Sequence, residues 1–153
     1  MGRIAGSASV EIGAPLAVVF ALAADVERMP DWQTGLLAAA VLERNRAGHA
    51  RRVRIETNHG TAVLRFDYRD PVAIAWHQEE GDAAHFAGAW RFEVTDTGAT
   101  LATYDVEVDL GRAWGLLIGG PIKAKLRERF VDAMPLCLRD HVHTTVCKQP
   151  VAQ

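Results

Sequence analysis

The chain of 153 residues has the length of one domain, and its 49% hydrophobic and 24% charged residues are near the averages for globular proteins. This composition excludes a disordered, collagen-like or coiled-coil protein. Lys and Arg number 17 against 19 Asp and Glu, which gives a net charge of -2 without a basic run, so nucleic acid is not an expected partner. We expect a single domain spanning residues 1–153, with an ordered core at about 7–143.

A strand and a helix open the predicted core. Residues 7–12 alternate polar and apolar side chains, which is the pattern of a half-buried strand. An almost wholly apolar helix is predicted from about Pro15 to Ala24, because Pro suits the first turn of a helix. This apolar run also has the length of a signal-peptide core. Only Arg3 supplies positive charge before it, so we expect a cytoplasmic protein.

After Trp32 the sequence changes to the period of strands. Six apolar-alternating segments are separated by short turns rich in Gly, Asn and Asp. They are Leu36 to Glu43, Arg51 to Thr57, Ala62 to Arg69, Val72 to Gln78, Phe86 to Val94 and Thr100 to Leu110. Because turns this brief join antiparallel neighbours, we predict a meander with the first strand at an edge. One face of this sheet is apolar and the other is charged.

A long amphipathic helix is predicted from Pro121 over about 25 residues, because apolar side chains recur there every three or four positions. Its apolar stripe comprises Ile122, Leu126, Phe130, Ala133 or Met134, Cys137 and His141. The stripe should cover the apolar face of the sheet, and Pro135 should bend the helix. A bent helix over a curved sheet that includes Gly88 leaves room for an internal cavity.

Apolar and aromatic side chains are predicted to line this cavity, since ligand pockets are built mainly from such groups. On the strands and the helix they are Leu36, Ile55, Phe66, Trp76, Trp90, Phe92, Val106, Ile122, Leu126, Phe130 and Met134. Two polar side chains, Thr57 and Gln78, are also expected in the lining. Trp32 and Trp114 fall in turns or loops, where gating the cavity and simple hydrophobic anchoring are both open roles.

Tyr68 and Tyr104 are the inward-facing groups best suited to act as acids. A phenol with a pKa of about 10 keeps its proton at neutral pH and can donate to a ketone oxygen. The alternative is that each hydroxyl bonds only a backbone group or water. No cofactor or metal is expected, because His141, His143 and Cys147 lack the paired spacing of structural zinc sites. No apolar stretch reaches the roughly 18 residues of a membrane span, so stable membrane insertion is not expected.

Four stretches carry a resemblance to a known family: Ala8 to Ile12, Asp25 to Trp32, Gly88 to Phe92 and Val106 to Gly111. With the order of elements, they resemble the START and Bet v 1-like (SRPBCC) superfamily, in its polyketide cyclase/dehydrase and coenzyme Q-binding branch. The resemblance implies an α+β helix-grip fold. In that fold a seven-stranded antiparallel sheet wraps around a long C-terminal helix, with short helices between strands 1 and 2.

The same resemblance implies an internal cavity that binds a lipophilic small molecule. One expected function is a polyketide cyclase/dehydratase that performs aldol cyclisation and dehydration of a poly-ketone or related lipophilic substrate, with an acyl carrier protein as a further partner. The alternatives are a non-catalytic carrier or chaperone of a lipid or quinone, and an interaction module whose pocket is vestigial.

Aromatase/cyclase members of the family use an arginine late in the strand that corresponds to Ala62 to Arg69, and a tyrosine shortly after the Pro-x-x segment. Arg69 matches the arginine by position and is the third catalytic candidate, but Leu36 occupies the place of the tyrosine. Strand alternation puts Arg69 on the charged face unless a bulge re-aims it.

Overall fold

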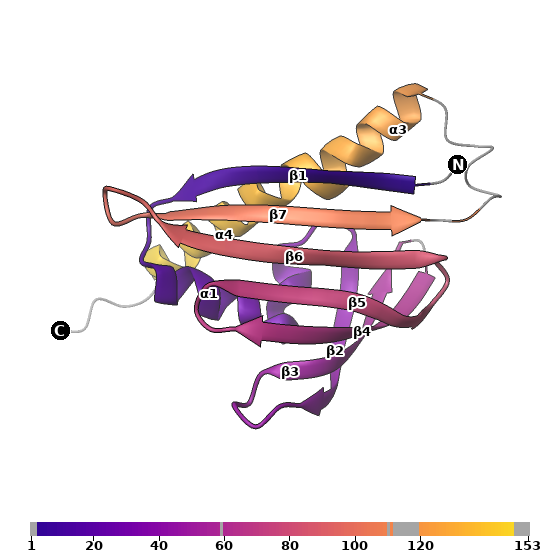
Figure 1. Cartoon of the computed structure of the whole chain (residues 1–153), viewed down its shortest axis with the longest axis horizontal. Coiled ribbons are helices and arrows are strands. Elements are labelled where there is room, and N and C mark those ends of the chain that lie inside the picture. Colours follow the sequence, from indigo (N-terminus) through magenta and orange to yellow (C-terminus); the bar gives the residue numbers. More distant parts are fainter. Residues whose placement is uncertain (1–2, 59, 110, 112–119, 149–153) are drawn as a thin grey trace.

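The computed structural model describes residues 3–58, 60–109, 111 and 120–148, with side chains described for all of these except 120–123, 130, 147 and 148 (Figure 1). In this described part, seven strands form one antiparallel sheet in the order β1-β7-β6-β5-β4-β3-β2. The strands are β1 (Arg3–Ile12), β2 (Leu36–Arg44), β3 (Ala50–Thr57), β4 (Gly60–Arg69), β5 (Ala73–Gly81), β6 (His85–Val94) and β7 (Thr100–Asp109).

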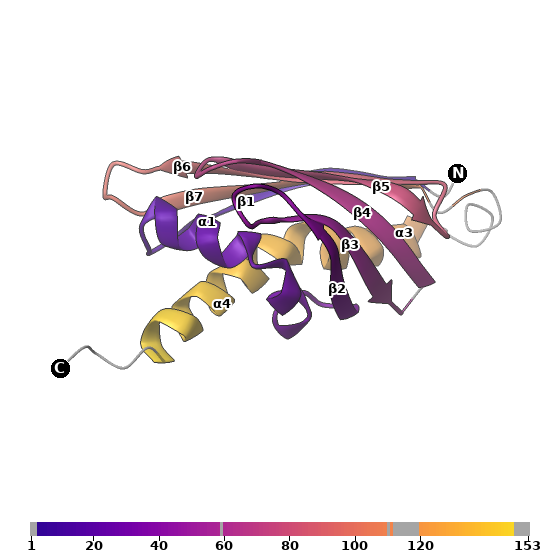
Figure 2. The ribbon, with the colours of Figure 1, turned by 90° about the horizontal axis from the view of Figure 1, so that it is seen from below.

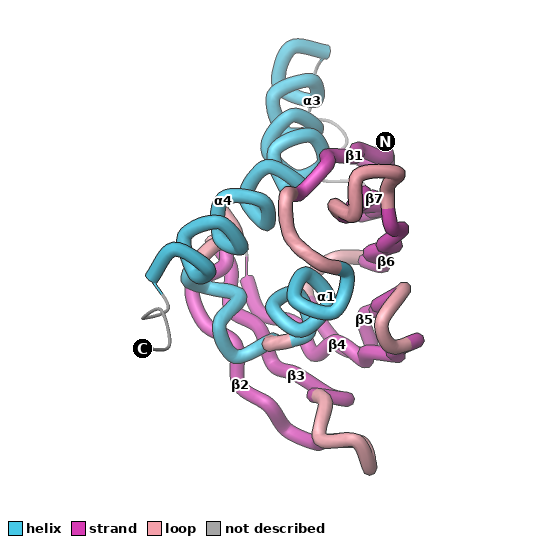
Figure 3. Tube along the Cα trace, turned by 90° about the vertical axis from the view of Figure 1, so that its left-hand side faces the viewer, coloured by secondary structure: helices cyan, strands magenta, loops and turns pink. Residues whose placement is uncertain are grey.

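The helices lie on one side of the sheet (Figure 2). Between β1 and β2 the chain forms α1 (Leu16–Ala24) and the short 3₁₀ helix η1 (Val26–Asp31). The C-terminal segment contains α3 (Gly120–Arg127), the π-helical turn η2 (Glu128–Asp132) and α4 (Ala133–Lys148), which run on without a break. Viewed from its end, the sheet curves around α1 and this long helix (Figure 3). The α+β helix-grip fold predicted from the sequence is confirmed.

The strands are longer than predicted at several ends, because pairing continues past the alternating residues. β1 begins at Arg3 instead of residue 7 and pairs with β7 along its whole length, from Arg3 opposite Asp109 to Ile12 opposite Thr100. Two hairpin turns use glycines at positive φ, Gly48 at 89° and Gly98 at 82°, a conformation that side chains with a Cβ rarely adopt. The meander is therefore determined by local turn chemistry.

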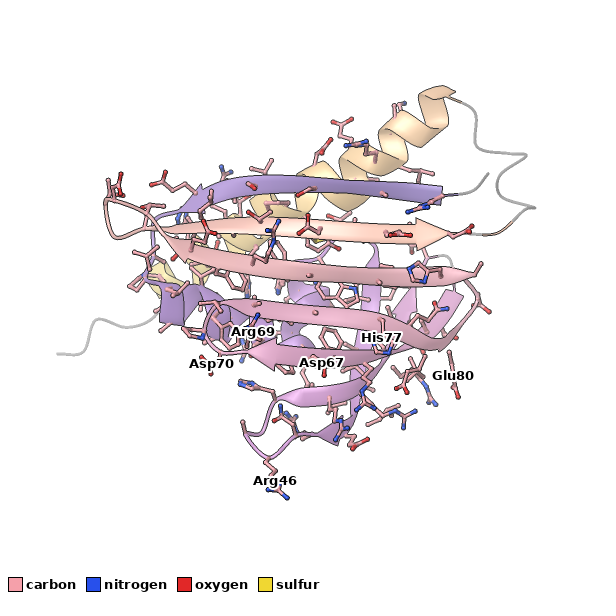
Figure 4. All side chains as sticks on the ribbon, in the orientation of Figure 1. Arg46, Asp67, Arg69, Asp70, His77 and Glu80 are labelled. Atoms are coloured by element: carbon pink, nitrogen blue, oxygen red, sulfur yellow. The ribbon has the colours of Figure 1, made fainter. Side chains whose placement is uncertain are left out.

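The two faces of the sheet differ as predicted. Inward positions such as Val53, Phe92 and Ala102 are fully buried. The outward face is charged, and its strands carry cross-strand ion pairs such as Arg91 with Asp105 at 3.0 Å. Asp67 and His77, labelled in Figure 4, are further exposed residues of strands β4 and β5. Because exposed ion pairs each contribute only about 0–1 kcal/mol, the buried face supplies most of the stability.

The long helix departs from regular α-helical geometry three to seven residues before Pro135, which is itself buried. The N–H of Ala133 bonds the carbonyl of Glu128, a five-residue span typical of a π-helical turn. Proline lacks an N–H, and its ring clashes with the carbonyl four residues earlier, here that of Val131. The π-helical turn therefore lies where Pro135 disturbs the regular hydrogen bonds.

This turn changes which helical side chains face the core. Leu126, before the turn, and Met134, after it, both line the cavity described below. The predicted stripe omitted Val131, Leu138 and Val142, which are each 0% exposed. The stripe was wrong at these positions because the extra residue in the turn shifts the helical phase.

Gly88 does not create open space, contrary to the expectation from the sequence. A Cβ added to it would lie 2.4 Å from Cζ2 of Trp76 and 2.8 Å from the carbonyl oxygen of Asp105. The Trp76 indole therefore lies directly over the backbone of Gly88, where any side chain would exclude it. This part of the sheet is packed core.

Candidate functional site

A cavity of about 200 Å³ opens between the sheet and the long helix. Its described lining comes from β1 to β7, from the segment that joins η1 to β2, from the turn between β5 and β6, and from the C-terminal helix. Apolar side chains such as Ile55, Val106 and Leu126 predominate, and a smaller set of polar groups accompanies them. Such a lining favours an apolar guest held by a few directed hydrogen bonds.

Eight of the residues proposed from the sequence line this cavity. They are Leu36, Ile55, Thr57, Gln78, Tyr104, Val106, Leu126 and Met134. Their side chains come from several different elements, and the curvature of the sheet brings them together. Inward-facing strand residues near one end of the sheet therefore meet the first half of the long helix.

Five other aromatic residues proposed as ligand contacts are absent from the described lining: Trp32, Phe66, Trp76, Trp90 and Phe92. They contact one another instead, with ring centroids of Phe66 and Trp76 6.0 Å apart and those of Trp90 and Phe92 5.9 Å apart. All five residues belong to the buried hydrophobic core. Trp114 lies outside the described residues, as do the side chains of Ile122 and Phe130.

Tyr104 brings a hydrogen-bond donor into the cavity. Its side chain is only 4% exposed, and its ring lies between those of Trp76 at 5.6 Å and Trp90 at 4.7 Å. In the described part of the chain, no group hydrogen-bonds to its hydroxyl. Burial raises the pKa of this phenol above its usual value, so it keeps its proton at any physiological pH. The Tyr104 hydroxyl therefore always has a proton to donate.

Tyr68 is placed differently, although it shares the inward face of the sheet. Its hydroxyl donates a hydrogen bond of 2.5 Å to the carbonyl of Ala50, and its ring stacks on His49 with centroids 4.6 Å apart. Burial raises the pKa of its phenol as well. Because its donor is already engaged by the backbone and it does not line the cavity, Tyr68 fits the alternative interpretation, in which the hydroxyl bonds only a backbone group.

Arg69 lies on the exposed outer face of the sheet (Figure 4). The pairing of β4 with β5 runs without interruption through Arg69 opposite Ala73, and the irregularity in this ladder lies between Val63 and Leu64. No bulge turns the guanidinium inward, so Arg69 is separated from the cavity by the sheet. Leu36 does line the cavity but offers no hydroxyl.

Several polar residues at the cavity were not anticipated from the sequence. They are Gln33, Thr34, Asn58, Thr61, Asp82 and Arg129. Most sit at strand ends or in turns, where alternation gives no reliable direction for a side chain. Asp82 accepts a hydrogen bond from the N–H of Thr61 at 3.1 Å, and Nε2 of Gln78 donates to the carbonyl of Ala83 at 2.9 Å. These bonds hold the β4 and β5 ends of the cavity in place.

Trp32 and His141 form a stacked pair beside the site, with ring centroids 5.7 Å apart. Nε1 of Trp32 and Nε2 of His141 are buried, and neither has a hydrogen-bond partner in the described part of the chain. The stack joins α4 to the segment that leads from η1 into the cavity wall. Burial lowers the pKa of His141, against a smaller raising effect of Asp31.

We expect this pair to make the fold sensitive to acid. In the unfolded chain His141 takes up a proton near pH 6.5, whereas in the fold it does so only at lower pH. The free energy of unfolding should therefore be fully retained above about pH 6.5 and fall as the pH drops below it. Urea unfolding of the wild type and His141→Phe between pH 7.5 and 5 should show a flatter profile for the variant. Replacing the exposed His77 by Phe is the control, and equal profiles for wild type and His141→Phe would contradict the prediction.

The fold and the apolar cavity define a helix-grip ligand-binding protein. The profile of the family described as polyketide cyclase/dehydrase and lipid transport matches residues 12–135. The chain belongs to this family, which confirms the resemblance found in the sequence and supports a hydrophobic ligand-binding role. None of the described helices is long and apolar enough to cross a membrane.

Solved structures share this fold at low sequence identity. A START superfamily protein from Mycobacterium smegmatis has a TM-score of 0.79 at 18% identity, over 92% of this chain and 98% of that one. A protein of Thermus thermophilus has a TM-score of 0.77 at 19% identity, over 94% and 98%. The Zhui aromatase/cyclase from a Streptomyces species has a TM-score of 0.66 at 20% identity, over 94% and 96%. No curated protein sequence matches the chain.

Proposed function

We propose that the protein binds a lipophilic carbonyl compound in its cavity and catalyses aldol cyclisation and dehydration of a poly-ketone chain. The observation that carries this proposal is the Tyr104 hydroxyl in an apolar cavity, with no partner in the described part of the chain. Because this hydroxyl is open to the cavity and bonds no described group, it can donate to a guest without breaking a bond within the protein. A ligand carbonyl would supply the missing acceptor.

In the proposed reaction Tyr104 donates a hydrogen bond to one ketone oxygen and draws electron density from its carbonyl carbon. The enol carbon of a second ketone in the same chain forms a bond to that carbon. The carbonyl π bond breaks, and the enol proton reaches the new alkoxide through water, which leaves a β-hydroxy ketone. Loss of one water molecule from this product completes the dehydration.

The size of the cavity sets what it can enclose. A dry cavity of about 150 Å³ holds benzene, so about 200 Å³ suits a body of one or two rings. Holding a flexible chain in such a bent form contributes to the rate by proximity, which requires few catalytic groups. Chains of this kind are carried as thioesters, so an acyl carrier protein is the delivery partner that the proposal implies.

Binding of a ketone to Tyr104 can be tested with two naphthalenes of similar shape. We expect Tyr104→Phe to weaken binding of 2-acetylnaphthalene by roughly 3- to 10-fold, and to leave binding of 2-ethylnaphthalene, which has no carbonyl, unchanged. Calorimetric titration provides both affinities. Tyr68→Phe is the matched control, because its hydroxyl bonds the Ala50 carbonyl. Equal losses for both probes, or for both variants, would remove Tyr104 from the proposal.

Turnover is tested with the same variants on a synthetic poly-β-ketone thioester, with the cyclised product measured by chromatography. Tyr104→Phe should lower the rate of product formation, while Tyr68→Phe should retain it.

A non-catalytic carrier of a lipid or quinone is the second candidate. It is favoured by the exposure of Arg69 and by the apolar side chain of Leu36, since neither residue supplies a polar group to the cavity. Native mass spectrometry of protein purified from its own host distinguishes the two. A carrier retains a lipid or quinone in stoichiometric amount and forms no product from the poly-ketone.

A further inference from the structure

The cavity has a cationic side chain at its edge. Arg129, on the π-helical turn η2, is the only basic residue among the described residues that line the cavity, and its side chain is exposed. It therefore combines contact with the apolar interior and access to solvent. Other arginines of the described chain, such as Arg3 and Arg91, lie within ion-pair distance of carboxylates.

No described carboxylate lies within ion-pair distance of Arg129. Asp82 also lines the cavity, but its Oδ2 accepts the hydrogen bond from Thr61 on the opposite, β4 and β5 side. Lys125 lies four residues before Arg129 on the same helix and is exposed. Arg129 is thus a positive group on the helical side of the cavity edge, with donors that no acceptor of the described chain uses.

The chemistry of guanidinium indicates what such an edge binds. Its planar, parallel N–H groups match the two oxygens of a carboxylate, and the match is stronger beside an apolar cavity than in open water. An exposed arginine needs no ligand for its own stability. At the edge of an apolar cavity, an arginine contributes to binding by favouring a negatively charged ligand over a neutral ligand with the same apolar body.

We propose that the cavity selects an amphipathic carboxylate, whose apolar body enters the cavity while its carboxylate binds Arg129 at the edge. This inference rests on the proposed function, because it assigns the charged end of a ligand whose carbonyl Tyr104 binds. The carboxylate exists only in the free acid, after the thioester to the carrier protein has been hydrolysed. The guest is then a keto acid with a ring-sized apolar body, instead of a neutral lipid.

The test compares 6-acetyl-2-naphthoic acid with 2-acetylnaphthalene by calorimetric titration at low ionic strength. The wild type should bind the acid roughly fivefold more tightly than the neutral ketone, as expected for an exposed ion pair. Arg129→Met should remove this preference and leave the affinity for the neutral ketone unchanged. Added salt should weaken binding of the acid alone.

Arg127→Met is the matched control. Arg127 lies two residues away and carries the same charge, but its guanidinium lies against β1, where a Cβ added to Gly6 would be 3.1 Å from Nη2. This variant should retain the preference for the acid. Equal affinities of the wild type for the two probes, or equal losses in the Arg127 and Arg129 variants, would overturn the inference while leaving the proposed function intact. If neither probe binds the wild type, the proposed function fails and the inference fails with it.

Discussion

Gly88→Ala is expected to destabilise the fold by about 1–3 kcal/mol, the range for adding a methyl group to a packed core. The new Cβ would lie 2.4 Å from Trp76 Cζ2 and 2.8 Å from the carbonyl oxygen of Asp105. The first contact requires the indole to move out of its place over β6. The second involves backbone of the paired strand β7, which cannot move without loss of ladder hydrogen bonds. Urea unfolding monitored by circular dichroism provides the free energy of unfolding.

Gly13→Ala is the control for adding a methyl group to a glycine. A Cβ at Gly13 would lie 3.7 Å from Nε2 of His143, which is ordinary contact, so this variant should keep nearly the wild-type stability. The smaller ring in Trp76→Phe should recover part of the loss when combined with Gly88→Ala, since the two sites are in contact. If Gly88→Ala is as stable as Gly13→Ala, the packing of Trp76 over Gly88 is not as described.

Ala62→Trp is expected to abolish ligand binding while the fold persists. Ala62 lines the cavity from β4, and an indole in place of its methyl group would occupy most of the space of about 200 Å³. Because the new ring enters existing space instead of packed core, we expect the free energy of unfolding to change by less than about 1.5 kcal/mol. Affinity for 2-acetylnaphthalene should fall by at least about 100-fold, since the ring would displace about 2.7 kcal/mol or more of apolar contact.

The matched control is Ala75→Trp on β5. Ala75 is exposed and alternates with the inward residues Ile74 and Trp76, so its side chain points away from the cavity. Val108→Trp provides a second block from the opposite side of the cavity, on β7, should the first variant fold poorly. Binding that survives in folded Ala62→Trp and Val108→Trp would place the ligand elsewhere on the protein.

The elements of the fold follow from local signals in the sequence. Alternation over residues 100–109 predicts the strand β7 and its inward face, since side chains of a strand point to opposite sides in turn. Glycines such as Gly98 mark turns too short for anything but antiparallel pairing. The helix-grip fold was predicted because these signals do not depend on distant residues.

The site depends on distant residues, and the two tyrosines illustrate this. Tyr68 and Tyr104 share the same residue type, the same inward face and the same raised pKa, so the sequence cannot rank them. The Tyr68 hydroxyl donates a hydrogen bond to the carbonyl of Ala50. The Tyr104 hydroxyl bonds no group of the described chain. The tertiary structure distinguishes them because curvature of the sheet determines which inward side chains meet a neighbour.

By itself, the sequence determined the order of the strands, their inward and outward faces and the family to which the chain belongs. Only the tertiary structure decided where the cavity lies, because Trp76 fills the space over Gly88 and the π-helical turn resets the helix from Glu128 onward. Leu126, Arg129 and Met134 line the cavity from before, within and after that turn. Side-chain packing and the phase of the helix depend on many contacts between distant residues, so a local sequence pattern does not predict them.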